Sequence, residues 1–244
     1  METVVTAVVC GVLGLCIGSF VNVVVHRVPR KESIVRPRSH CPKCGVELAN
    51  RDNVPVVSWL VLGGRCRACH APISVRYPLV ELGTAALFVA GAIRFDADWA
   101  LPAYLVFFGS LVAISAVDLE HYIIPNRIVY PTIFIAVPLL ALAAAVQHDW
   151  TSFEHALAGA VCAFALLLVV HLVSPRGMGF GDVRLSFLLG LFLGFLLGSL
   201  IGLVLIALRR RRRRDHIPFG PFLAAGAVLA VLFGNPIIDW YLGR

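Results

Sequence analysis

Long hydrophobic segments alternate with short polar stretches along the chain, and this pattern predicts helices that cross a membrane. A spanning helix needs about 20 mostly apolar residues. Segments near this length are expected at Val4–Val25, Pro78–Ile93, Trp99–Val117, Ile128–Val146 and His155–Val173, with a last one from Ile217 to Trp240. With the uncharged stretch Leu185–Leu208, they predict an all-α fold, a polytopic helical membrane bundle of about seven to eight hydrophobic segments.

Composition agrees with this pattern. The 244 residues are 59% hydrophobic and 14% charged, with a mean hydropathy of +0.86, whereas soluble domains carry about 25% charged residues. The first segment is expected to stay in the protein, because its start carries Glu2 and no cation, unlike a cleavable signal. The net charge of +7 does not indicate nucleic-acid binding, because the basic residues cluster beside hydrophobic segments.

Positive charge sets the expected orientation. Ten of the 21 Lys and Arg lie in residues 26–77, and cytoplasmic loops carry such an excess. Counting crossings from this loop places Asp118 and Asp182 together at the cytoplasmic boundary. We therefore expect a first transmembrane helix (1–25), a cytoplasmic loop domain (26–77) and a transmembrane domain with both acids (78–244).

The segment before six consecutive arginines, Arg209–Arg214, does not fit a simple crossing. Residues 183–208 would measure about 39 Å as one helix, and one crossing would place the arginines outside, against the positive-inside rule. Two crossings would leave arms of about 20 Å, shorter than a bilayer core of about 30 Å. We expect a short hairpin or broken helix, with the arginines at the inner leaflet and glycines from Gly190 onward as a packing face.

Two Cys-x-x-Cys pairs in the loop domain predict a metal site. They are Cys41 with Cys44 and Cys66 with Cys69. Four thiolates at this spacing suit tetrahedral Zn²⁺, because each pair supplies two ligands from one tight turn. Disulfides or unused cysteines are the alternatives, but thiols stay reduced in the cytoplasm. We expect a structural zinc that folds a loop with little core of its own.

Two acids at the edges of hydrophobic segments form the candidate catalytic pair. Asp118 ends one segment and Asp182 opens another. An acid bordering lipid is costly to keep charged, which suggests a function. Two facing carboxylates that share a proton can activate water, the charged one as base and the neutral one polarising a carbonyl. On spacing alone, a helix N-cap for Asp182 and a polar helix end for Asp118 remain equally open.

Glycines precede Asp182 at alternate positions and would let backbone and an extended substrate come close. With several other motifs, this stretch makes the chain resemble the bacterial prepilin peptidases, the type 4 prepilin leader peptidase and N-methyltransferase family of GxGD aspartyl proteases. The motifs occur in one order: Gly18–Arg27, the paired cysteines, Arg76–Leu82, Asp118 with Ile124 and Pro125, Gly177–Asp182, and Ile217–Phe222.

The resemblance implies that Asp118 and Asp182 are the catalytic dyad, with Gly179, Gly181 and Arg184 as motif residues beside Asp182. It implies an enzyme of the bacterial cytoplasmic membrane that cuts the basic leader from type IV prepilins or pseudopilins at the cytoplasmic face. Members with the cysteine-bearing loop usually also methylate the new N-terminus with S-adenosylmethionine. The expected partners are prepilins and bilayer lipid.

Three features depart from the family's pattern. Asn126 stands where the family often has Asp, Arg184 replaces the usual Lys, and residues 183–208 are about one helix short. The alternative function is therefore a truncated or catalytically impaired member that binds prepilins as a membrane scaffold.

Two polar residues inside hydrophobic segments are further candidates for substrate or motif roles. Glu81 could contact the cationic leader or the methyl donor, because an intramembrane acid is functional by default. Asn22 lies one turn from His26. It could line the site or make a packing hydrogen bond between helices.

Overall fold

The computed structural model describes residues 2–173, 179–192 and 220–242, with residues 235–242 described by their backbone alone. The helices are α1 (Glu2–Arg27), a 3₁₀ turn η1 (Asn50–Asn53), α2 (Val57–Val61), α3 (Arg76–Phe95), α4 (Leu101–His121), α5 (Asn126–Gln147), α6 (Trp150–Val173) and α8 (Gly220–Leu242). Residues 180–192 are also helical. The described residues contain no strand, only two isolated bridges, His40 with Glu47 and Arg65 with Pro72.

The expected helical membrane bundle is confirmed. Five of the described helices, α1 and α3 to α6, are long and apolar enough to cross a membrane. Most of the expected ends of these five segments were short by a few residues, because helical hydrogen bonding continues past the last apolar side chain; the exceptions are the start of α4, at Leu101 instead of Trp99, and the end of α6, at Val173 as expected. Most importantly, α4 continues to His121 instead of ending at Val117, so Asp118 lies inside its last turn.

Of residues 183–208, the segment before the six arginines, the structure describes only residues 183–192. Residues 183–192 belong to one helix, and a Cβ on Gly190 would lie 2.4 Å from the Gly159 carbonyl oxygen of α6. This contact agrees with a glycine packing face. The expected hairpin or break after residue 192 and the arginines at 209–214 lie outside the described residues.

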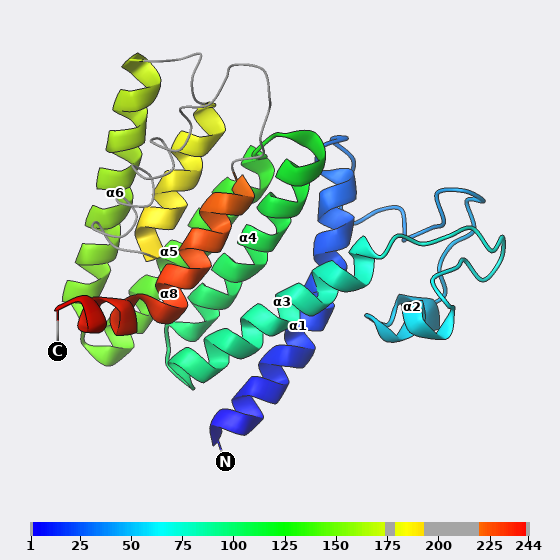
Figure 1. Ribbon diagram of the computed structural model, residues 1–244, viewed down its shortest axis with the longest axis horizontal. Helices are drawn as coiled ribbons and strands as arrows, with labels where there is room; N and C mark the ends of the chain where they lie inside the picture. Colours follow the sequence, from blue (N-terminus) through cyan, green and yellow to red (C-terminus); the bar gives the residue numbers. More distant parts are fainter. Residues whose placement is uncertain (1, 174–178, 193–219, 243–244) are drawn as a thin grey trace. The chain divides into compact units, whose positions relative to one another are not determined.

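The chain forms two compact units, Met1–Ala97 and Asp98–Arg244. Figure 1 shows the helices of both units, coloured by their order in the sequence. By packing, α3 belongs to the same unit as α1. The division expected from function instead separates the loop domain from α3 after residue 77. The three-part division by role into 1–25, 26–77 and 78–244 remains a proposal.

Small residues hold the first unit together. A Cβ on Gly14 would lie 2.6 Å from Ala85 Cα, and a Cβ on Gly18 would lie 2.6 Å from Glu81 Cα. As the residue number rises along α1, the partner's number falls along α3, so the two helices are antiparallel. Glycines at this spacing let two backbones approach closely in a membrane. The contact fixes Glu81 beside α1, well inside the helix pair.

The core of the second unit is α4. More than half of its most apolar stretch is buried, against a third or less for the other four candidate spans. It packs against α5 and α8, and the Phe107 ring stacks on Phe192 at 4.1 Å between centroids. This surrounding protein buries Asp118 in the last turn of α4, whereas the next residues, Leu119 and Glu120, are exposed.

Candidate functional site

Asp118 is held by a segment that is distant in sequence. Its side chain is only 5% exposed, and its Oδ2 accepts a hydrogen bond of 2.7 Å from the backbone N–H of Gly220, the first residue of α8. A Cβ on Gly220 would lie 2.9 Å from the same oxygen. Glycine therefore allows the start of α8 to reach the carboxylate, and the N–H fixes one carboxylate oxygen in place.

Asp182 lies in the first turn of the helix at residues 180–192 and is also buried. Its backbone N–H donates to the Gly179 carbonyl at 3.1 Å, so Asp182 follows the start of the helix instead of capping it. The preceding Gly181 is tightly enclosed, because a Cβ there would lie 3.0 Å from Ile124 Cβ. The glycine therefore lets this turn lie directly against the loop that follows α4.

A second contact joins the same two segments. The Arg184 guanidinium donates a hydrogen bond to Asn126 Oδ1, and its Cζ lies 4.4 Å from the Phe180 ring centroid and 5.7 Å from that of Tyr130. Asn126 and Arg184 are the two residues at which the sequence departs from the resembled pattern, and here they form one contact. The turn bearing Asp182 is thus attached to the loop after Asp118 through Gly181 and through Arg184.

The four paired cysteines come together as the spacing predicts. Their sulfur atoms all lie within 4.8 Å of one another, and all seven cysteines are free thiols. Cys41 Sγ and Cys69 Sγ are 3.8 Å apart, about the separation that tetrahedral Zn–S bonds of 2.3 Å require. The group can therefore hold a metal ion.

The backbone shapes both cysteine turns and favours the thiolate at Cys41. The two pairs repeat one turn, since Gly45 N–H donates to the Cys41 carbonyl and His70 N–H to the Cys66 carbonyl. Both turn residues have positive φ, +73° at Gly45 and +55° at His70. Hydrogen bonds from the backbone N–H groups of Cys44 and then Lys43 lower the pKa of Cys41 to about 6, which favours the thiolate that binds metal.

Comparison with known proteins covers nearly the whole chain. The family model described as "Type IV leader peptidase family" matches residues 105–238, and "Bacterial Peptidase A24 N-terminal domain" matches residues 12–95. The chain belongs to the type IV leader peptidase family. The match at residues 105–238 contains Asp118 and Asp182, and the match at residues 12–95 contains the four paired cysteines.

Curated relatives of the leader peptidase family cover both parts at once. The Aeromonas hydrophila prepilin leader peptidase/N-methyltransferase is 35% identical over 268 residues, covering 93% of this chain and 91% of the relative. The protein of that name from Pseudomonas aeruginosa is 35% identical over 277 residues, covering 96% and 93%. The one from Bacillus subtilis is 36% identical over 242 residues, covering 95% and 96%. No solved structure matches the chain.

The two remaining candidate residues, Asn22 and Glu81, lie in the first unit. Asn22 Nδ2 donates to the Tyr77 carbonyl at 3.1 Å, which is the interhelical packing bond that the sequence left open. Glu81 is 7% exposed, and its Oε2 accepts the Val56 N–H at 2.7 Å. Both side chains bind backbone of the same unit, and this favours a structural role for each.

Two features of the structure were not predicted. The Gly220 N–H reaches Asp118 across 102 residues of sequence, and the only signal was that Gly220 belongs to a motif. Val56 has φ +61° and ψ −51°, an outlier for a β-branched residue. Nothing in the sequence around Val56 indicates a left-handed residue.

Proposed function

We propose that this protein is an integral-membrane aspartyl endopeptidase that removes the leader peptide of type IV prepilins or pseudopilins, with Asp118 and Asp182 as the catalytic pair. The observation that carries this proposal is the attachment of the buried Asp182 turn to the loop after the buried Asp118. Family membership supplies the reaction class, and the names of the relatives supply the substrate class.

The proposed mechanism uses the two carboxylates in different protonation states. The charged one takes a proton from a water molecule, and the neutral one donates a proton to the oxygen of the scissile carbonyl. Like charges in a shared desolvated site keep the second group protonated. The Gly220 N–H holds Asp118 in one orientation, so a substrate need not order that side chain before reaction.

The same proposal includes N-methylation of the new N-terminus with S-adenosylmethionine, a donor chosen because the relatives are named as N-methyltransferases. It places the protein in the bacterial cytoplasmic membrane with the active site on the cytoplasmic side. Ten of the 21 Lys and Arg, concentrated in residues 26–77, support this orientation.

We further propose that Cys41, Cys44, Cys66 and Cys69 hold a structural Zn²⁺. All four positions of a tetrahedral ion would be filled by thiolates, so the ion would supply folding free energy and no open site for substrate. Its role would be to order residues 40–72, which have few buried side chains besides Cys41 and Cys66.

Incubation of the purified protein with a type IV prepilin, followed by mass spectrometry of the pilin N-terminus, tests the proposal. The expected product lacks the leader and, when S-adenosylmethionine is present, carries one methyl group on the new N-terminus. A protein that binds the prepilin and leaves it intact would instead be a scaffold. The shortened segment gives little support to that alternative, since the Bacillus subtilis relative aligns over 96% of its length in 242 residues.

A further inference from the structure

An uncharged apolar run lies inside an otherwise charged loop. Residues 54–62 read Val-Pro-Val-Val-Ser-Trp-Leu-Val-Leu and contain α2. The three most open of these side chains are Val57, which is 54% exposed, Leu60 at 63% and Val61 at 74%. They stand three and four residues apart, so they share one face of the short helix. In water this face would be an unfavourable exposed patch.

The run folds back along the membrane helices. The Val56 N–H binds Glu81 at 2.7 Å, and Glu81 packs against Gly18 of α1. From Gly18, α1 continues nine residues to Arg27, or about 14 Å at 1.5 Å per residue. Figure 1 shows α2 well short of the level at which α1 ends. The apolar run therefore lies at a depth where α1 is already a candidate membrane span.

A cavity beside α1 shows that the loop reaches the same depth along this helix. Its volume is about 450 Å³, and it lies between the loop and α1. Residues Asn53 and Pro55 line it from the loop, and Cys16 and Ser19 line it from α1. Cys16 is eleven residues before the end of α1, about 16 Å along the helix. Part of the loop thus borders α1 as far as Cys16, near the middle of that helix.

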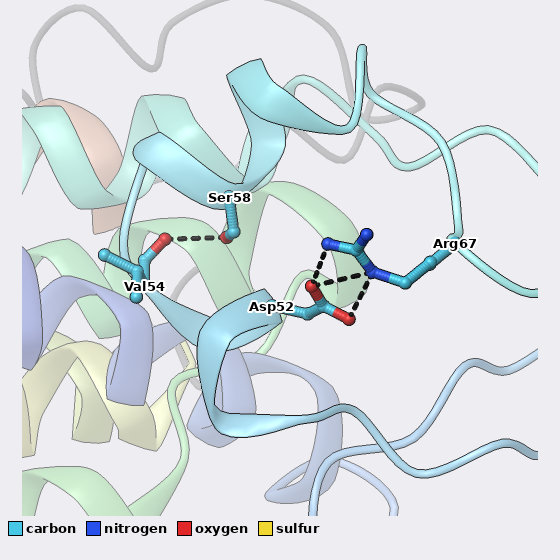
Figure 2. A network of polar contacts seen from close by, with 4 residues as sticks. All are labelled: Asp52, Val54, Ser58 and Arg67. Carbon is cyan, nitrogen blue, oxygen red and sulfur yellow. Dashed lines mark hydrogen bonds and ion pairs between the residues drawn. The ribbon is translucent and has the colours of Figure 1, made fainter.

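Polar groups within the run are satisfied internally, as a lipid environment requires. The Ser58 hydroxyl donates to the Val54 carbonyl at 2.6 Å, as Figure 2 shows, and Trp59 Nε1 donates to the Ile73 carbonyl at 3.2 Å. The N–H groups of Leu60 and Leu62 bond to the carbonyls of Val56 and Ser58, both at 3.0 Å. The exposed face of α2 therefore presents methyl groups with little unmet hydrogen bonding.

Charged residues flank the run on the loop side. Arg67 donates two hydrogen bonds to Asp52 Oδ1 and one to Oδ2, at 2.6 to 3.1 Å (Figure 2). The neighbouring Arg51 and Arg65 are exposed. An apolar face bordered by arginines is the pattern of an element that lies in the membrane interface, with the cations at the phosphate level.

We propose that residues 54–62 are an interfacial anchor, in which Val57, Leu60 and Val61 insert into the lipid beside α1 and α3. The anchor fastens the cysteine-bearing loop to the bilayer. The hydrogen bond from the Val56 N–H to Glu81 fixes the turn that directs the three side chains outward. This bond also explains why Val56 adopts a positive φ. The proposal does not depend on peptidase activity.

Lipid quenching of tryptophan fluorescence tests this anchor in the full-length protein. One variant carries Val61→Trp with Trp59, Trp99, Trp150 and Trp240 replaced by Phe. The matched control carries Val46→Trp in the same background. Val46 is a similarly open valine, 51% exposed, in the first cysteine turn of the same loop. Each is reconstituted into vesicles of phosphatidylglycerol and phosphatidylcholine, with and without bromine on the acyl chains.

The tryptophan at position 61 should lose about half or more of its emission in brominated vesicles, as an apolar face buried 5–10 Å deep would. It should also resist aqueous iodide. The control should respond only to iodide. Iodide quenching at position 61 without bromolipid quenching would overturn the anchor. Protection from both quenchers would also overturn it, because protein and not lipid would then cover the face.

Discussion

Replacing Gly220 by alanine tests whether the start of α8 positions the carboxylate of Asp118, half of the proposed catalytic pair. The added Cβ would lie 2.9 Å from Asp118 Oδ2 and 3.3 Å from Asp118 Cγ. Because contacts this short essentially never occur for a real Cβ, the carboxylate or the start of α8 must move. The 2.7 Å hydrogen bond from the Gly220 N–H is then lost or lengthened.

The size of the effect follows from that bond. A hydrogen bond to a charged group contributes about 1.5–3 kcal/mol, which corresponds to a rate decrease of roughly 10- to 150-fold if the bond is fully lost in the transition state. In the proposed mechanism Asp118 acts on the scissile bond and not on the leader's distant contacts. We therefore expect kcat to fall by most of this amount while KM stays close to that of the wild type.

The assay is the initial rate of leader removal by the purified protein at several prepilin concentrations. Gly83→Ala in α3 is the matched control, since a Cβ there meets nothing within 4 Å, and alanine favours a helix by about 1 kcal/mol. Alanine before Pro221 also disfavours the helical conformation, so unfolding of Gly220→Ala is measured alongside its activity. A folded Gly220→Ala protein with wild-type kcat would refute the proposed positioning.

Three other predictions concern the arginine contact and the loop. Arg184→Ala should lower kcat and change KM less, because it removes the link to Asn126 and two ring contacts each worth about 0.5–2 kcal/mol. Arg184→Lys should fall between, and equal activity of all three proteins would contradict the contact's role. Cys44→Ser and Cys69→Ser should each lose bound zinc, whereas Cys162→Ser in α6 should retain it; unchanged zinc content in the first two would exclude the site. Arg67 holds the pKa of Asp52 below its usual range, so this ion pair stabilises the loop above about pH 4, the unfolded pKa of Asp, and the stabilisation disappears as pH falls through the folded pKa. The protection of residues 50–67 from hydrogen exchange, taken relative to the intrinsic rate at each pH, should therefore fall in acid by a larger factor in the wild type than in Asp52→Asn, and equal acid sensitivity would argue against the pair.

Hydrophobic pattern was sufficient to predict the bundle but not where its helices end. The apolar run of α6 suggests a start at His155, whereas the helix begins at Trp150. Asp149 explains the difference, because its Oδ1 accepts the Ser152 N–H at 3.2 Å and the Thr151 hydroxyl at 2.6 Å. Such a cap extends a helix through polar residues, which a hydropathy pattern does not detect.

Site residues were predictable where chemistry is local. Each Cys-x-x-Cys turn is set by a few neighbouring residues, so spacing alone predicted the cysteine cluster. The donor to Asp118 is a backbone N–H that carries no side-chain signature, and it comes from a helix 102 residues later. Arg184 and Asn126 are likewise 58 residues apart. Contacts of this kind depend on how α4, α5, α8 and the helix at residues 180–192 pack, and helix packing is not encoded in any one segment.

The central claim is that Asp118 and Asp182 together cleave the leader. Its most direct test is leader removal by Asp118→Asn and Asp182→Asn, since each substitution keeps the shape of the side chain and removes its ability to carry the proton. Both variants should retain zinc and still bind a prepilin, yet leave it uncleaved at the level of a reaction without protein. Cleavage by either variant at a rate near that of the wild type would contradict the dyad.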